Sequence, residues 1–196
     1  MKTLRNAGVA TIIGLLLGFI YVLIFLLITL PKIGNDIALE SAVNSFFSPV
    51  ILILAGLISI VVLSLTFSGF VDLGKKMNNK LLVVVSWAFL ILLILNIIYS
   101  IISVSTMQNP LDAASIDNTV EVVFFSLLTL MIALLGISLL FFKGKVDFAK
   151  STGILYIFTA GLFVSMIFNF IGILTYIAAL ILQAIMFFKV SNKIGK

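Results

Sequence analysis

Few residues in this chain could do chemistry, and those that stand inside its apolar runs are uncharged. The 196 residues include no His and no Cys, which excludes imidazole bases, thiolate nucleophiles, Fe–S clusters and Cys- or His-ligated metals. The polar residues of interest are Asn96, Tyr99, Asn169, Tyr176 and Gln183. Amides and phenols can line a solute cavity or form hydrogen bonds between helices. We expect no catalytic, cofactor-binding or metal-binding residue, and therefore no enzyme.

The placement of the ionisable residues excludes further kinds of chemistry. Every Lys, Arg, Asp and Glu lies outside the long apolar runs or within a residue or two of their ends. Proton relays, ion-coupled pumps and voltage sensors need such groups at mid-depth in the membrane. We therefore predict neither proton-coupled transport nor carboxylate catalysis within the bilayer. The sequence also lacks the glycine-rich nucleotide motifs and the hydrolase and zinc motifs, so we expect no cofactor.

The elements that must position the polar residues are membrane helices. Hydrophobic residues make up 63% of the chain and charged residues 10%, and the mean hydropathy is +1.37. A typical soluble domain has about 25% charged residues. No aqueous fold could hide so much evenly spread apolar surface, so soluble, disordered and fibrous classes are excluded. The sequence predicts an all-α integral membrane protein.

The apolar runs predict six spans in a single transmembrane domain. A helix needs about 20 apolar residues to cross a hydrocarbon core of about 30 Å. The expected spans are residues 7–30, 49–71, 81–104, 120–142, 152–169 and 172–188. The last two share one apolar run, which we expect to break in a turn at 169–172 because Asn and Gly tolerate left-handed conformations. Five spans, with that run unbroken, is the alternative.

The charge distribution favours six spans over five. With six, one side of the membrane carries eleven of the twelve Lys and Arg residues, and the other side carries only Lys32. With five, the ratio is eight to four. Basic residues concentrate on the cytoplasmic side, so we predict a multi-pass protein of the plasma membrane with both termini in the cytoplasm. The eleven residues are Lys2, Arg5, Lys75, Lys76, Lys80, Lys143, Lys145, Lys150, Lys189, Lys193 and Lys196.

Two cytoplasmic segments resemble each other and suggest an internal duplication. Residues 65–75 read LTFSGFVDLGK, and residues 140–150 read LFFKGKVDFAK. Six of the eleven positions match. A duplication of spans 2–3 and 4–5 would produce this echo, and so would chance in so biased a composition.

A second resemblance reaches outside the chain. It includes the segment Ser151–Tyr156, the sequence IGI at 171–173 and the sequence AIMFF at 184–188. Together with residues 73–82, these are similar to an archaeal-type family of small polytopic membrane proteins of unknown function, whose members read "AGLLY…IIGIG…AFF". The resemblance implies a multi-span protein of a prokaryotic plasma membrane. It implies no known activity, so no catalytic residue is carried over.

A stripe of small residues in the first span suggests how the protein acts. Ala10, Gly14 and Gly18 are four residues apart, which gives a smooth helix face that another helix can approach closely. The face could dock a partner subunit or pack within its own bundle. With no chemistry in view, we predict a non-enzymatic structural or accessory subunit that acts through helix packing with itself or with partner membrane proteins.

The alternative is a small-solute binding or transport subunit. Asn96, Tyr99, Asn169 and Tyr176 would then line a cavity in the outer half of the membrane. Six spans in 21.3 kDa resemble, in architecture alone, the substrate-binding subunits of vitamin-importing transporters. We favour instead that Asn96 and Gln183 form hydrogen bonds between helices, worth about 0.6 kcal/mol each.

The predicted partners are the lipid bilayer and, through the stripe, other subunits or a second copy. The basic loops are explained by topology, or alternatively by contact with anionic lipid headgroups. Nucleic acid is excluded because the lysines are divided among short segments without interleaved aromatic residues.

Overall fold

The computed structural model describes residues 2–32, 38, 41, 48–106, 118–142, 145–165 and 169–194. These residues form six α-helices and a short 3-10 turn, and they contain no strand. The helices are α1 (Lys2–Thr29), α3 (Pro49–Lys76), α4 (Lys80–Thr106), α5 (Asn118–Leu140), α6 (Ala149–Val164) and α7 (Asn169–Ile194), and the turn η1 (Leu30–Lys32) follows α1. The predicted all-α, six-helix bundle is confirmed.

The helices other than α6 are long and apolar enough to cross a membrane. An apolar segment in lipid must satisfy its backbone groups internally, which a helix does. Pro49 begins α3, where a missing N–H costs nothing. The remaining helix, α6, has 16 residues, or about 24 Å, which is shorter than the hydrocarbon core. The protein is a multi-pass membrane protein whose apolar helices contact the bilayer.

The break between the last two helices differs from the predicted turn. Helix α6 ends at Val164 and α7 begins at Asn169, so 169–172 is helix; residues 166–168 lie outside the described residues. Gly172 packs against α6 instead of turning the chain. A Cβ atom on Gly172 would lie 2.7 Å from the Phe163 ring. The glycine therefore permits close helix packing and is not needed for a left-handed turn.

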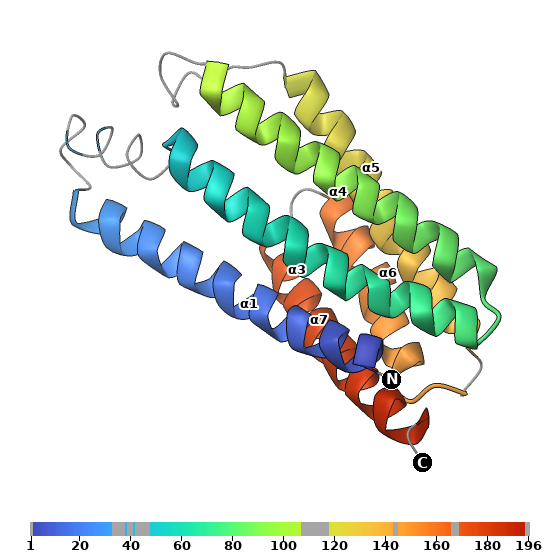
Figure 1. Ribbon diagram of the computed structural model, residues 1–196. Helices are drawn as coiled ribbons and strands as arrows, with labels where there is room; N and C mark the ends of the chain where they lie inside the picture. The colour runs from blue at the N-terminus through green and yellow to red at the C-terminus, as the bar shows by residue number, and fades with distance from the viewer. Residues whose placement is uncertain are drawn as a thin grey trace.

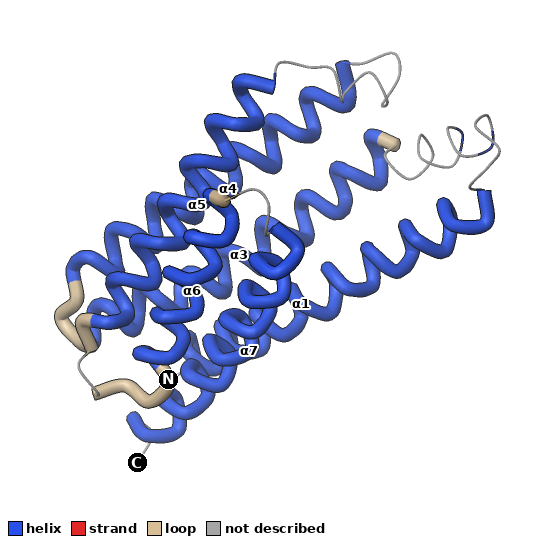
Figure 2. Tube along the Cα trace, turned by 180° about the vertical axis from the view of Figure 1, so that it is seen from behind, coloured by secondary structure: helices blue, strands red, loops and turns tan. Residues whose placement is uncertain are grey.

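The six helices form a ring in which each packs against its neighbours in the order α1, α3, α4, α5, α6, α7 and back to α1. Both chain termini lie at the same end of the ring (Figure 1). Seen from behind, the shorter α6–α7 hairpin covers the end near the termini, and the other four helices extend beyond it (Figure 2). The ring is therefore complete only over part of its height.

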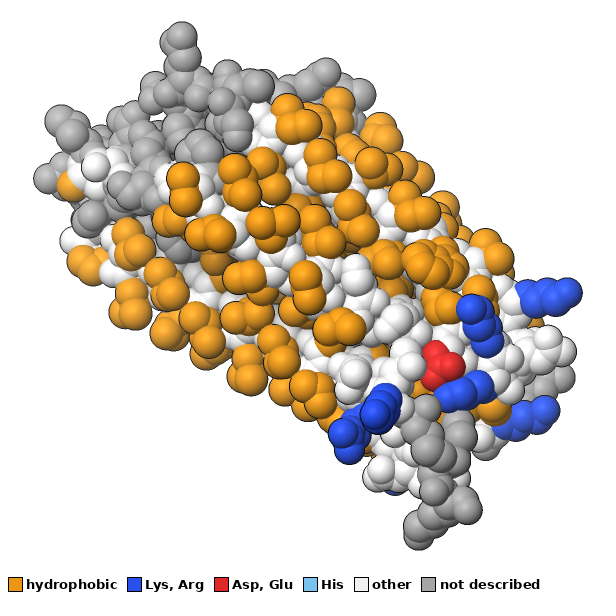
Figure 3. Space-filling model, in the orientation of Figure 1, with side chains coloured by type: hydrophobic (Ala, Val, Ile, Leu, Met, Phe, Trp, Pro, Cys, Tyr) orange, Lys and Arg blue, Asp and Glu red, His pale blue; other side chains and the backbone are white. Residues whose placement is uncertain are grey.

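One end of the bundle gathers nearly all of the described basic residues, Lys32 being at the other end, and we call it the basic end (Figure 3). Its described members all have exposed side chains. They are Lys2, Arg5, Lys75, Lys76, Lys80, Lys145, Lys150, Lys189 and Lys193. Lys143 and Lys196 lie outside the described residues. The face of the bundle that Figure 3 shows is covered between its ends by apolar side chains, as a lipid-facing surface requires, and large exposed hydrophobic side chains occur on each of the six helices.

The packed core lies in the half of the bundle next to the basic end. In α1, the buried residues are Leu4, Ala7, Gly8, Ala10 and Thr11, followed only by Thr29 at the far end of the helix. Phe70 of α3 meets Phe187 of α7 edge to face, with ring centres 4.9 Å apart. Phe67 meets Phe89 of α4 in the same way at 5.1 Å. Aromatic packing of this kind joins α3 to both neighbours across the core.

The two similar segments do not share a backbone conformation. Residues 65–75 lie within α3, whereas the segment 140–150 includes the last residue of α5, Leu140, and the beginning of α6 at Ala149. The duplication stays a prediction from the sequence.

Candidate functional site

A buried hydrogen-bond network joins three helices in the middle of the bundle. Gln183 of α7 is 1% exposed. Its Nε2 donates to Oγ1 of Thr11 in α1, at 3.2 Å. Its Oε1 accepts a hydrogen bond from the hydroxyl of Tyr156 in α6, which is also 1% exposed. The prediction that Gln183 forms hydrogen bonds between helices is confirmed.

A second contact continues this network between α6 and α7. Thr159 Oγ1 donates to Thr175 Oγ1 at 2.9 Å, and Thr175 donates to the carbonyl of Gly172 at 2.9 Å. The ring of Tyr176 lies 6.0 Å from that of Tyr156. The network thus runs along the α6–α7 hairpin and reaches α1 through Gln183. Buried polar groups that are paired in this way favour one arrangement of the helices.

The chemistry available to this network is hydrogen bonding. Its members are amide, phenol and hydroxyl groups, and none is paired with a carboxylate or an amine. Thr11 donates to the carbonyl of Ala7 in its own helix at 2.9 Å, so its hydroxyl is held by the helix. Among the described residues, the structure has no group of three or more acidic residues that could hold a metal ion.

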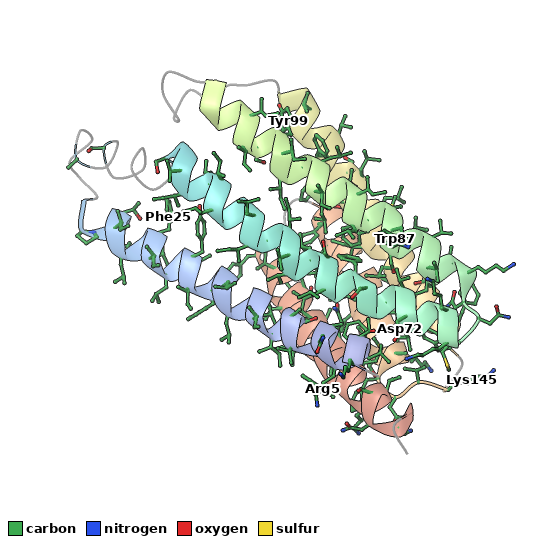
Figure 4. All side chains as sticks on the ribbon, in the orientation of Figure 1. Arg5, Phe25, Asp72, Trp87, Tyr99 and Lys145 are labelled. Atoms are coloured by element: carbon green, nitrogen blue, oxygen red, sulfur yellow. The ribbon has the colours of Figure 1, made fainter. Side chains whose placement is uncertain are left out.

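The residues predicted for an outer cavity lie in two places. Asn96 and Tyr99 are on the part of α4 far from the basic end, and Tyr99 packs on Phe124 of α5 with ring centres 5.5 Å apart. Figure 4 shows Tyr99 toward the opposite end of the bundle from Arg5, Asp72 and Lys145. Tyr176 of α7 lies beside the buried network, where its ring contacts that of Tyr156.

Within the part of the chain that the structure describes, no hydrogen bond or ring contact joins Tyr176 to the α4 pair. The side chain of Asn169 lies outside the described residues. Asn96 follows Leu82 and Phe89 at seven-residue intervals, so it lies on the helix face that points into the core. It is nevertheless half-buried, and no described residue pairs with its amide.

The small-residue stripe on α1 divides into a packed part and an open part. Ala10 is 2% exposed. A Cβ atom on Gly14 would lie 2.9 Å from Cγ1 of Val62 in α3, so Gly14 is part of the contact between α1 and α3. A Cβ atom on Gly18 would have no described residue within 4 Å. Intramolecular packing therefore uses the stripe only as far as Gly14.

Helices α5 and α6 meet at two glycines that the sequence analysis did not single out. A Cβ atom on Gly136 of α5 would lie 2.6 Å from the carbonyl oxygen of Gly153 in α6. The reverse distance, from a Cβ on Gly153 to the Gly136 carbonyl, is 2.7 Å. The two backbones are in direct contact. An isolated glycine inside an apolar helix is a general signal of close packing, but it does not identify the partner helix.

Two ion pairs stabilise the basic end. Lys76 pairs with Asp72 one turn earlier in α3, and Lys193 of α7 pairs with Asp147 before α6, both with N–O distances of 2.8 Å. The hydrogen bond from Lys193 lowers the pKa of the Asp147 carboxyl below its ordinary value. The ammonium of Lys189 lies 4.7 Å from the centre of the Phe148 ring. The Lys193–Asp147 pair and the Lys189–Phe148 contact hold the beginning of α6 against the end of α7.

No protein-family model matches the chain, and neither a curated protein nor a solved structure matches it. The resemblance to the archaeal-type family stays a prediction from residues of the chain.

Proposed function

We propose that the protein is a non-catalytic subunit of the plasma membrane that acts by packing against another membrane protein or a second copy of itself. The supporting observation is the open part of the stripe on α1. Beyond Gly14, this helix leaves Gly18 uncovered, with Phe19 68% exposed and Val22 54% exposed. A glycine flanked by large apolar side chains gives a helix face that another helix can approach closely.

The orientation that we propose has both termini in the cytoplasm. The termini and the basic end coincide (Figures 1 and 3), and basic residues concentrate on the cytoplasmic side of membrane proteins. In this orientation, the open part of α1 lies in the outer half of the bilayer. A docked helix would therefore contact the protein in the leaflet away from the cytoplasm.

Substitution Gly18→Leu tests the docking face. The new side chain has room among the described residues of the monomer because none of them lies within 4 Å of its Cβ position. It would block a helix that packs closely on Gly18, so we expect the association to weaken about tenfold or more. Native electrophoresis of membranes solubilised in mild detergent would measure it, as a shift of the wild-type assembly toward the 21.3 kDa chain alone.

Gly161→Leu is the matched control. Gly161 also has nothing within 4 Å of its Cβ position, but it lies on α6. The proposal requires that this variant keep the wild-type assembly. Equal loss of assembly in both variants, or a wild-type protein that runs as a single chain, would contradict it. Gly14→Leu is not a useful test because its contact with Val62 would disturb the fold itself.

A second copy and a different partner can be told apart because the chain contains no cysteine. Val22→Cys introduces a single thiol on the open part of α1. Oxidation should give a disulfide-linked homodimer if the occupant is a second copy, and only monomer if it is another protein.

Asn96 favours the second candidate function, binding of a small solute in the outer half of the membrane. Its amide is half-buried on the inward face of α4 and has no partner among the described residues. If it binds a solute, Asn96→Leu should abolish co-purification of that solute, detected by mass spectrometry of the extracted protein. If the amide has no such role, the variant and the wild type will carry the same small molecules.

A further inference from the structure

A hollow at the basic end is lined by charged and apolar side chains together. Its volume is about 420 Å³. It lies where the connection between α3 and α4 meets the end of α5. The lining residues are Met77, Asn78, Asn79, Lys80, Leu81, Phe141, Phe142 and Lys145. The sequence separates the two halves of this set by about sixty residues, and the fold brings them together.

The wall of the hollow is held by the side chain of Asn79. Its Oδ1 accepts a hydrogen bond from the backbone N–H of Leu82 at 3.0 Å, which caps the beginning of α4. Its Nδ2 donates to the carbonyl of Ser138 in α5 at 2.8 Å. Asn78 adopts the left-handed conformation, with φ 53°, which asparagine tolerates. One side chain therefore fixes the connection to the neighbouring helix.

The two lysines of the hollow, Lys80 and Lys145, have no carboxylate counter-ion among the described residues, whereas Lys76 and Lys193 each have one. Asp72 and Asp147, the described acidic residues of the basic end, are paired with Lys76 and Lys193. No described carboxylate lies within ion-pair distance of Lys80 or Lys145. The beginning of α4 adds the partial positive charge of a helix N-terminus to the same place. The hollow therefore attracts an anion.

Apolar side chains lie exposed beside these lysines. Phe141 is 59% exposed and Leu81 is 38% exposed. Both residues lie at the boundary between the apolar surface and the basic end. In a membrane, the boundary between the lipid headgroups and the acyl chains lies at the same depth. A free inorganic anion would use the lysines and leave the apolar surface uncovered. An amphiphile would cover both.

We infer that this hollow binds an anionic phospholipid, with the headgroup phosphate between Lys80 and Lys145 and an acyl chain along Phe141 and Leu81. The site is distinct from the open face of α1 and does not depend on the role proposed for it. A lysine near a membrane surface contributes about fivefold to the binding of an anionic lipid. Loss of both lysines of the site should therefore cost about twenty-five-fold.

Native mass spectrometry of the full chain in detergent, titrated with phosphatidylglycerol or phosphatidylcholine, tests the inference. We expect the wild type to retain phosphatidylglycerol in preference to phosphatidylcholine. Lys80→Gln combined with Lys145→Gln should weaken phosphatidylglycerol retention about twenty-five-fold. Lys150→Gln removes the same kind of charge from an exposed position at the same end and outside the hollow, so it should keep most of the affinity.

Three outcomes would overturn the inference. One is a loss of affinity from Lys150→Gln equal to that from Lys80→Gln alone or from Lys145→Gln alone, which would mean diffuse attraction to the basic end. Another is equal retention of the two lipids by the wild type. The third is displacement of phosphatidylglycerol by inorganic phosphate at a similar concentration, which would show a site for soluble phosphate. Phe141→Ser also distinguishes a phospholipid site from a site for soluble phosphate, because it should weaken lipid binding and leave phosphate binding unchanged.

Discussion

Substitution Gly136→Ala is expected to destabilise the bundle by about 1–3 kcal/mol, although it adds only one methyl group. The added carbon would lie 2.6 Å from the backbone carbonyl of Gly153 and 2.9 Å from Cγ1 of Ile157. A flexible side chain could rotate away, but the backbone of α6 cannot. The two helices must separate, and their close packing is lost along the contact. Thermal unfolding in detergent, followed by circular dichroism or by Trp87 fluorescence, measures the loss.

Two further variants determine whether the glycine contact itself is responsible. Gly153→Ala should have a similar effect because its Cβ would meet the Gly136 carbonyl at 2.7 Å. Gly161→Ala adds the same methyl group to the same helix where nothing lies within 4 Å, so its stability should be unchanged or slightly higher. A Gly136→Ala variant as stable as Gly161→Ala would show that α5 and α6 are not in backbone contact.

The class of the protein could be predicted because it depends on segment length and hydropathy alone. A long apolar run has one stable arrangement in lipid, and that is a helix. Helix ends were less predictable. The expected second span ends at 71, whereas α3 continues to Lys76 and includes Asp72. Hydropathy falls where the hydrocarbon core ends, but helical hydrogen bonds continue into the headgroup region.

The contacts between helices could not be predicted because the helices are apolar on all sides. A soluble helix shows which face is buried by the contrast between its apolar and polar sides. Here that contrast is nearly absent. Gln183 could therefore be predicted to form hydrogen bonds between helices, whereas no residue pattern identifies Thr11, 172 residues away, as its partner. The contact between Gly136 and Gly153 was missed for the same reason.

Tyr156→Phe and Gln183→Met are each expected to destabilise the protein by about 1–2 kcal/mol. Both substitutions nearly preserve shape and remove one partner of a buried hydrogen bond. Without Gln183, the Tyr156 hydroxyl loses its acceptor in a site that is 1% exposed. Without the Tyr156 hydroxyl, the amide oxygen of Gln183 loses its donor. Each single variant therefore leaves a polar atom unpaired where no water replaces the lost partner.

The double variant separates the hydrogen bond from the packing of the two side chains. The double variant lacks both the Tyr156 hydroxyl and the Gln183 amide, so neither group remains buried without its partner. Its loss of stability should therefore be smaller than the sum of the two single losses by about 1 kcal/mol. Tyr176→Phe is the control, since that hydroxyl has no hydrogen bond among the described residues and its ring lies beside Tyr156. It should be close to wild type.

Additive losses in this cycle would mean that Tyr156 and Gln183 contribute independently. The network would then be a set of separate contacts and would not lock α6 against α7. Coupled losses would show that the buried hydrogen-bond network determines how the α6–α7 hairpin packs to complete the ring of helices. Lipid provides no hydrophobic force that prefers one apolar helix face over another. A few hydrogen bonds and glycine contacts must then select the rotation of each helix, and this is why one buried amide can matter more than the many leucines around it.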